Sequence, residues 1–543
     1  MRFRSLTRIS LATILLAALP TLTSAADAPA KPADEHADAV KPVHFLPQSQ
    51  RSQGSVTIGG ARVDYEALAG TLVVHAKGWD DVPQNASKDA AENPPPESSM
   101  FYVAYFRTAP AGKVPQAPRP ITFFYNGGPG SPSIWLHMGA FGPRRIVTAD
   151  DSHTAPAPYD LINNDSSLLD VTDMVFIDAP GTGFSRIAGK DAGKAFWGVD
   201  QDSHAFAEFI EQFLSKYGRW NSPKYLFGES YGTTRSAAVA NVLAADYNID
   251  LNGVILLSQI LMFDGSADEP QFNPGVDLPY MLVLPTYAAA AWYHHKLPGT
   301  QPADLGTFLS EVERFALGDY AQALLAGSTV STEQRQSVAE RLHQYTGLPL
   351  ASILKANLRV NGGTFQQMLQ ADGDIATGRL DARFSGATLD PLSKEAEYDA
   401  QSSAISSAYY AAFNDYVRRD LHWGEGQFFR GADLWKTWDF HHQAPGANRP
   451  MAQATNVIPD LATAMKLNPQ MHVLVHAGYY DMATPYFAAE YEMNHLPVSA
   501  ELQKHVEFAF YPSGHMIYAH ESSLKDLHAK TAAFIARFAR KAQ

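Results

Sequence analysis

The chain has 543 residues, of which 45% are hydrophobic, and such a composition is typical of a large globular protein with a substantial core. Its 42 basic and 56 acidic residues give a net charge of −14, and no basic run is long enough to indicate nucleic-acid binding. The absence of cysteine excludes disulfides and thiol chemistry. We expect no cofactor and no metal ion.

Residues 1–25 have the features of a secretory signal peptide. Three arginines precede an apolar run over residues 9–19, and small residues at 23–25 offer a cleavage site. The run is too short to span a bilayer comfortably, which argues against an uncleaved anchor. We therefore expect export to the periplasm or the extracellular space, and no membrane span in the mature protein. Residues 26–43 lack periodicity and are expected to form a disordered linker.

Residues 44–262 have the pattern of the first part of an α/β core. Apolar residues alternate over 53–77 and 100–107, which predicts antiparallel strands. Beyond them, continuous apolar runs alternate with helical patterns, which is typical of strands buried on both faces of a mostly parallel sheet. These runs lie at 121–125, 174–177, 224–227 and 254–257, and a helical pattern covers 200–217.

Residues 263–450 are predicted to form a helical insertion, or cap. Ser331 and the residues up to Gln334 have the signature of a capping box, which predicts a helix running towards Gly347. A separate domain with its own function is the alternative. The tryptophans of this segment are expected to be core residues rather than a substrate platform: Trp292, Trp423, Trp435 and Trp438.

Residues 451–543 resume the α/β pattern and are predicted to form the second part of the core. Apolar strands at 472–475 and 506–510 each end in a glycine-containing segment, and a long amphipathic helix closes the chain. The two core segments together predict one α/β domain, interrupted by the insertion.

The pentapeptide Gly-Glu-Ser-Tyr-Gly at 228–232 has the pattern of a nucleophile elbow, because an apolar run precedes it and an Ala-rich helical run follows it. The glycines leave room for a tight turn that exposes the hydroxyl of Ser230. Taken alone, the pentapeptide also fits a strand-to-helix turn with a buried serine.

A serine hydroxyl needs a base to take its proton, and the base needs a carboxylate to orient it. The order Ser230, Asp481, His515 is the order of α/β-hydrolases, and each residue follows a predicted strand. All three would therefore meet at the carboxyl edge of one sheet. His472 and His476 lie at the start of or within a strand and are interpreted as structural.

An acyl-transfer site also needs two backbone N–H groups for the oxyanion. Tyr231, directly after the serine, is expected to supply one. The loop Asn-Gly-Gly-Pro-Gly at 126–130 is expected to supply the other, with Gly128 as the donor. A phosphate-binding loop is the alternative for this segment, but the chain has no Gly-Lys-Ser/Thr pattern and no dinucleotide fingerprint.

Five motifs follow one another from residue 121 onwards, at 126–130, 178–185, 228–232, 478–481 and 514–516. They occur in the order found in serine carboxypeptidases, the family of carboxypeptidase Y and cathepsin A, and the chain resembles that family. The resemblance implies an α/β-hydrolase fold with a helical cap, and cleavage of single residues from peptides with a free C-terminus. It implies the same triad and oxyanion donors, and it assigns Asn126 and Glu229 to the terminal carboxylate of the substrate.

The chain departs from the family pattern at several positions. Ser131 stands where the family has a cysteine, and Phe124 stands where it has a tryptophan. Ala140 stands where the family has a second glutamate, so half of the acid pair that binds the terminal carboxylate is missing.

Two other functions remain open at this point. An esterase or an acyltransferase would use the same triad with a different acyl pocket and acceptor. A non-catalytic binding protein on this fold is the third hypothesis, and the complete triad argues against it.

Overall fold

The structure is a computed structural model, and the predicted signal peptide and linker lie outside the part of the chain that it describes. The described residues are 45–79, 95–108, 118–431, 434–450 and 453–539. Among these residues, no helix combines the length and apolarity needed to cross a bilayer.

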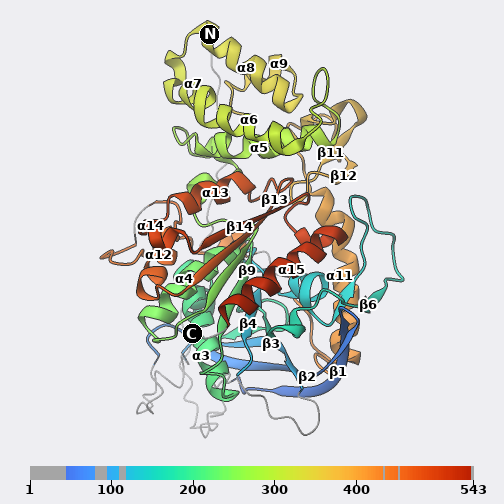
Figure 1. Cartoon of the computed structure of the whole chain (residues 1–543), viewed down its shortest axis with the longest axis vertical. Helices are drawn as coiled ribbons and strands as arrows, with labels where there is room; N and C mark the ends of the chain where they lie inside the picture. Colours follow the sequence, from blue (N-terminus) through green and yellow to red (C-terminus); the bar gives the residue numbers. More distant parts are fainter. Residues whose placement is uncertain (1–44, 80–94, 109–117, 432–433, 451–452, 540–543) are drawn as a thin grey trace, which may run out of the picture. The chain divides into compact units, whose positions relative to one another are not determined.

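A large mixed sheet forms the centre of the structure (Figure 1). Its first four strands pair antiparallel, and the strands from β7 onwards in spatial order run parallel, which confirms the mostly parallel sheet. In spatial order the strands are β1 (Ser49–Ile58), β2 (Ala61–His75), β3 (Glu97–Arg107), β7 (Asp173–Ile177), β4 (Ile121–Tyr125), β9 (Lys224–Glu229), β10 (Gly253–Leu257), β13 (His472–Gly478) and β14 (Val506–Tyr511), with β8 (Arg186–Ala188) paired to β3.

The parallel strands β7, β4, β9, β10 and β13 are buried on both faces, as their continuous apolar runs predict, whereas the last strand of the sheet, β14, is only partly buried. In β4, Phe123 and Tyr125 point to one core and Phe124 points to the other. The first core includes helices α3 (Val199–Lys216), α4 (Tyr231–Ala245) and α12 (Ile458–Leu467). The second includes α11 (Ala400–Arg419) and α15 (Glu521–Phe538).

The segment predicted as an insertion packs in two groups. Its first helices share a core of their own, together with side chains that follow β13, whereas α11 joins the core of the sheet. The helices of the first group are α5 (Leu278–Tyr293), α6 (Leu305–Phe315), α7 (Ala321–Ala326), α8 (Thr332–Thr346), α9 (Leu350–Lys355) and α10 (Gly362–Met368). The predicted boundaries of the insertion stay a prediction.

In this segment the structure confirms one predicted helix and contains a hairpin that the sequence did not predict. The predicted helix is confirmed, with Ser331 as its N-cap, since the Ser331 side chain accepts a hydrogen bond from the Gln334 N–H and Gly347 ends α8 at φ 69°. The short hairpin of β11 (Ile375–Thr377) and β12 (Ser385–Ala387) was not predicted. Strands of three residues give too little alternation to be recognised in a sequence.

The shorter elements include β5 (Arg144–Ile146), β6 (Leu161–Asn163), α2 (Ala192–Phe196), α13 (Tyr486–Asn494), α14 (Ala500–Gln503) and a π-helical turn at Leu136–Phe141, besides several single turns of helix.

A buried ion pair fixes α3 and α4 to each other beneath the candidate active site. Arg235 Nε and Nη2 donate to the carboxylate of Asp202 at 2.6 and 3.2 Å, and neither side chain is exposed. Arg235 Nη1 also donates to the backbone carbonyl of Asn126 at 2.7 Å. The pair therefore ties the two helices to the loop that follows β4.

We expect Asp202→Ala to lower the free energy of unfolding by about 3–5 kcal/mol, because it leaves the guanidinium of Arg235 buried without its counter-ion. Asp64→Ala is the matched control, since Asp64 pairs with Arg62 on an exposed surface. That change should cost less than about 1 kcal/mol. Urea denaturation of both variants measures the difference, and equal shifts would show that the buried pair adds nothing.

Candidate active site

Ser230 lies in a strained turn between β9 and α4. Its backbone has φ 60° and ψ −131°, a conformation that a residue with a side chain adopts only where the surroundings impose it. A Cβ at Gly228 would lie 2.1 Å from the Gly232 carbonyl oxygen, and one at Gly232 would lie 2.9 Å from that of Tyr125. Both glycines of the pentapeptide are therefore required, and the turn exposes the Ser230 hydroxyl to a cavity.

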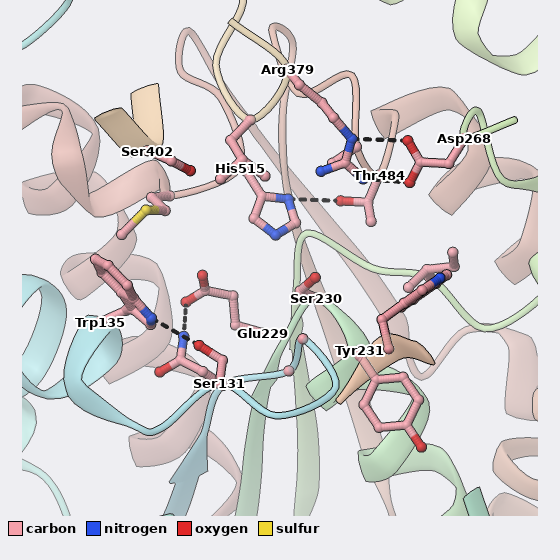
Figure 2. A pocket seen from close by; sticks show the side chains of 18 of the residues that line it. Ser131, Trp135, Glu229, Ser230, Tyr231, Asp268, Arg379, Ser402, Thr484 and His515 are labelled. Carbon is pink, nitrogen blue, oxygen red and sulfur yellow. Dashed lines mark hydrogen bonds and ion pairs between the residues drawn. The ribbon is translucent and has the colours of Figure 1, made fainter. Parts of the chain in front are cut away.

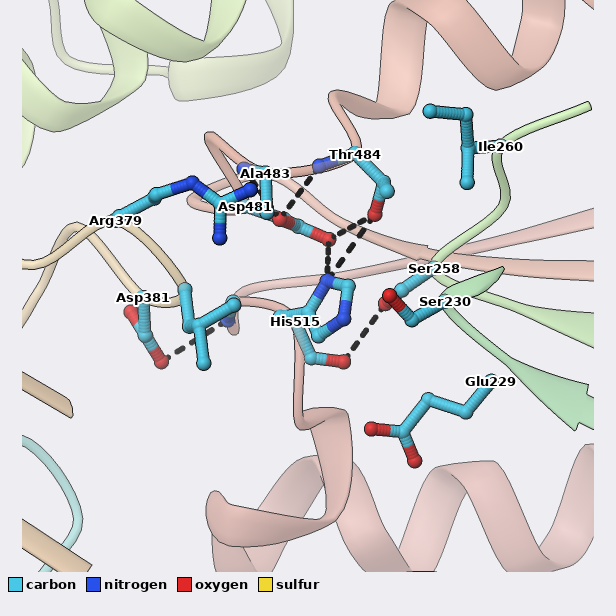
Figure 3. A network of polar contacts seen from close by, with 12 residues as sticks. Glu229, Ser230, Ser258, Ile260, Arg379, Asp381, Asp481, Ala483, Thr484 and His515 are labelled. Atoms are coloured by element: carbon cyan, nitrogen blue, oxygen red, sulfur yellow. Dashed lines mark hydrogen bonds and ion pairs between the residues drawn. The ribbon is translucent and has the colours of Figure 1, made fainter. Parts of the chain in front are cut away.

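The structure brings Asp481 and His515 together at the same edge of the sheet. Nδ1 of His515 lies 2.7 Å from Oδ2 of Asp481, and the imidazole faces Ser230 (Figure 3). Oδ1 of Asp481 accepts hydrogen bonds from the backbone N–H groups of Ala483 and Thr484 at 2.9 and 3.0 Å. The carboxylate is thus held in place and can orient the imidazole.

Burial alone would lower the pKa of His515. The negative charge of Asp481 and the hydrogen bond to it, together with the charge of Glu229, outweigh burial, so the pKa is raised. The Ser258 hydroxyl donates to the His515 carbonyl at 2.7 Å and fixes its backbone. His515 therefore combines a fixed position with increased basicity, as a general base requires.

The glycine loop after β4 lies against the elbow. A Cβ at Gly127 would lie 2.4 Å from the backbone nitrogen of Tyr231, so only glycine permits this approach. Gly128 has φ 108° and lines the same cavity as Ser230 and Tyr231. This arrangement fits the two N–H donors predicted for an oxyanion.

A buried carboxylate from the next motif supports the glycine loop. Oδ1 of Asp178 accepts hydrogen bonds from both the backbone N–H and the hydroxyl of Ser133, each at 2.8 Å. Burial raises the pKa of Asp178 to about 6, although these hydrogen bonds lower it. The motif at 178–185 therefore holds Ser133, three residues after the loop at 126–130.

Glu229 and Asn126 form one cluster beside the nucleophile. Asn126 Nδ2 donates to Glu229 Oε2 at 2.8 Å, and the Tyr518 hydroxyl donates to the same oxygen at 2.9 Å. Burial raises the pKa of Glu229 to about 7, while His515 and both hydrogen-bond donors lower it. The group can therefore be neutral or charged near neutral pH. Ala140 is fully buried in the core, and the side chain that bonds Glu229 besides Asn126 is that of Tyr518.

The cavity has a volume of about 300 Å³ and opens beside Ser230 (Figure 2). Trp135, Glu229 and Ser402 line one side in this view, and Arg379 with Asp268 lines the other. A volume of this size suits the end of a chain or a small molecule.

Every residue predicted for the site lies at this cavity or, for Asp481, directly behind His515. The expectation for Trp435 was wrong, because its side chain is 48% exposed and lines the cavity, whereas Trp423 and Trp438 are buried in the core. Sequence reasoning also missed Thr484 and Tyr518. Tyr518 is recognisable only by its bond to Glu229 across the fold, whereas Thr484 bonds Asp481, three residues before it, and lies beside His515.

A serine at a strained strand-to-helix turn, with a histidine and an aspartate after later strands of the same sheet, defines the α/β-hydrolase class. The serine carboxypeptidase family model matches residues 91–514. The chain belongs to the serine carboxypeptidase family.

Two curated relatives match shorter segments. The pheromone-processing carboxypeptidase KEX1 of Debaryomyces hansenii is 31% identical over 138 residues, which are 25% of this chain and 18% of that protein. Serine carboxypeptidase-like 50 of Arabidopsis thaliana is 27% identical over 176 residues, which are 32% of this chain and 36% of that protein. The matched segments thus span well under half of either relative.

The crystal structure of Kex1(delta)p, a prohormone-processing carboxypeptidase from Saccharomyces cerevisiae, is similar in fold. It aligns with a TM-score of 0.50 and 15% identity, covering 86% of this chain and 91% of that chain. At this level of identity the likeness shows the fold alone.

We expect a fluorophosphonate to label Ser230, and Ser230→Ala to abolish the labelling. His515→Ala should slow labelling on the order of 10⁴- to 10⁶-fold, because the hydroxyl then has no base. The control is His520→Ala, since His520 bonds Ser523 instead and should leave the rate unchanged. Intact-protein mass spectrometry measures the rates. Rapid labelling of His515→Ala would reject the triad.

Proposed function

We propose that the protein is an exported serine carboxypeptidase that removes single residues from the C-termini of peptides. The observation that carries this proposal is the convergence on one cavity of Ser230, His515, the glycine loop and the Asn126–Glu229 pair. The first three can perform acyl transfer, and the pair can bind a carboxylate.

In the proposed reaction, Oγ of Ser230 attacks the carbonyl carbon of the last peptide bond while His515 takes the hydroxyl proton. The N–H groups of Gly128 and Tyr231 stabilise the oxyanion. His515 then gives the proton to the leaving amine, and the terminal amino acid departs from an acyl-enzyme. Water, deprotonated by His515, attacks the acyl-enzyme and restores Ser230. Asp481 stays ionised and orients the imidazole throughout.

Glu229 is proposed to select substrates with a free C-terminus. When protonated, it can donate a hydrogen bond to the terminal carboxylate, and the Asn126 amide offers a second donor. When ionised, Glu229 repels that carboxylate. Binding of the substrate anion therefore favours the protonated form.

The departure at Ala140 favours a second candidate function. With one acid instead of two, recognition of a terminal carboxylate depends on Glu229 and its neighbours. An esterase or acyltransferase would use the same triad without that recognition.

Incubation with a mixed peptide library, read by mass spectrometry, tests the proposal. We expect ladders that lose C-terminal residues one at a time. Internal cuts would instead indicate an endopeptidase. Intact peptides, combined with fluorophosphonate labelling at Ser230, would support the esterase or acyltransferase.

We expect kcat/KM for free-acid peptides to fall as the pH rises through about 7, because Glu229 loses its proton there. Glu229→Gln, which cannot ionise, should remove this alkaline fall. For the amidated peptide, which both forms of Glu229 accept, the same variant should move the acid limb to lower pH, because the negative charge of Glu229 contributes to the raised pKa of His515. Rates measured across pH for free-acid and amidated forms of one peptide separate the two effects.

The amidated peptide carries no terminal charge and should show no fall near pH 7. Glu492→Gln is the matched variant, since Glu492 is a second buried carboxyl whose pKa burial raises to about 7, and it bonds Gln259 away from Glu229. That variant should keep the alkaline fall. Identical profiles for the free-acid and amidated peptides would mean that Glu229 does not recognise the carboxylate.

The proposed export depends on residues 1–25, whose arginines, apolar run and small residues are typical of a secretory signal peptide. Comparison of the N-terminus of the secreted protein with the encoded sequence tests it. An N-terminus near residue 26 in the culture medium or the periplasm is expected.

A further inference from the structure

The turn between β11 and β12, residues 378–384, lies against both loops that carry the proposed catalytic base and its carboxylate (Figure 3). This turn belongs to the segment predicted as an insertion, whereas Asp481 and His515 follow strands of the central sheet. Residues more than 90 positions apart in sequence therefore meet behind the imidazole.

Four consecutive residues of the turn, 379–382, make hydrogen bonds to these loops. The turn accepts three of them and donates the fourth. The donors and acceptors are Met482 N–H to the Arg379 carbonyl at 3.1 Å, His515 N–H to the Leu380 carbonyl at 2.6 Å, Gly514 N–H to Asp381 Oδ2 at 3.0 Å, and Ala382 N–H to the Tyr480 carbonyl at 2.8 Å. Each bond engages His515 itself or a residue adjacent to His515 or Asp481.

Asp381 provides the side-chain contact of this set. Its carboxylate is fully buried, and it pairs with the guanidinium of Arg383, whose Nη2 donates to Oδ2 at 2.6 Å. A Cβ at Gly514 would lie 2.4 Å from the Cβ of Asp381, so only glycine permits the approach. The backbone directly before His515 is thus pressed against a carboxylate that is itself held by an ion pair.

The start of the turn is also held by Asp399, the residue that caps α11. Oδ1 of Asp399 accepts hydrogen bonds from the N–H groups of Arg379 and Leu380, and Oδ2 accepts one from Ser402 N–H. The turn therefore has a fixed position of its own and does not simply follow the His515 loop.

We infer that Asp381 is a positioning residue for His515, and that the 378–384 turn fixes the imidazole relative to Ser230. This inference rests on the proposed triad. Asp381 touches neither substrate nor a reacting atom, and it acts through the backbone of Gly514 and His515. Because a misplacement of about 1 Å can cost about 10²-fold in rate, loss of this contact should slow catalysis without weakening substrate binding.

The test compares Asp381→Ala with Asp381→Asn. The alanine variant removes the acceptor for Gly514 N–H, and kcat should fall about 10²-fold while KM stays within about twofold. The asparagine variant keeps an amide oxygen as an acceptor and should fall between the alanine variant and the wild type. If Asp381→Ala fails to fold, by circular dichroism, Asp381→Asn alone decides.

Asp277→Asn is the matched control. Asp277 also belongs to the insertion and pairs with an arginine, Arg359, through both carboxylate oxygens at 2.6 and 2.7 Å, but it contacts neither catalytic loop. Its loss should leave kcat and KM unchanged. A second readout is the proton NMR signal of the His515 N–H that bonds Asp481, which should shift or broaden in the Asp381 variants only.

The outcomes separate this inference from the function on which it rests. If the wild type is labelled by a fluorophosphonate but the folded Asp381 variants keep its kcat and its His515 signal, the positioning role alone is overturned. An equal loss in Asp277→Asn would overturn it too, as a general effect of insertion stability. If the wild type is neither labelled nor active on peptides, the proposed function falls, and this inference falls with it.

Discussion

The strained backbone conformation of Ser230, with its positive φ, is the constraint on which the rest of the site depends. A serine at φ 60° keeps this conformation only because β9, α4 and the glycine loop leave no alternative. The same close packing requires glycine at 127, 228 and 232, and it brings the backbone of Tyr231 beside the loop at 126–130. One strained turn thus exposes the hydroxyl and places the backbone of Tyr231 and the glycine loop at the same cavity.

His515 and Glu229 are buried titratable groups at the same cavity, and the pKa of each depends on the charge of the other. The charge of Glu229 raises the pKa of His515, and His515 in turn lowers that of Glu229. Each therefore holds its proton according to the state of the other. In the proposed function, a terminal carboxylate favours protonated Glu229, and this protonation removes the negative charge that raised the pKa of His515. Under that proposal, substrate binding and the basicity of His515 are coupled through the proton on Glu229.

The features predicted from the sequence are those with local signals. The pentapeptide around Ser230 combines two glycines with a strand before it and a helix after it, and chain order then pointed to Asp481 and His515. The sheet was predicted because strands buried on both faces are continuously apolar. Tyr518 and Trp435 gave no comparable signal. The residues around a tryptophan in the sequence do not show whether it lines a cavity or is buried in a core. Only the folded structure distinguishes the two cases.

The segment predicted as an insertion contributes to the proposed chemistry as well as to the shape of the pocket. Residues 379–382 hold the loops of Asp481 and His515, while the side chain of Arg379, from the same turn, lines the cavity beside Asp268. The first group of insertion helices also packs on Tyr480 and Met482, which flank Asp481. A substitution that displaces residues 379–382 would therefore alter both the substrate cavity and the position of His515. Substrate preference and turnover should be hard to alter separately in this part of the chain, because a single turn supplies contacts to both.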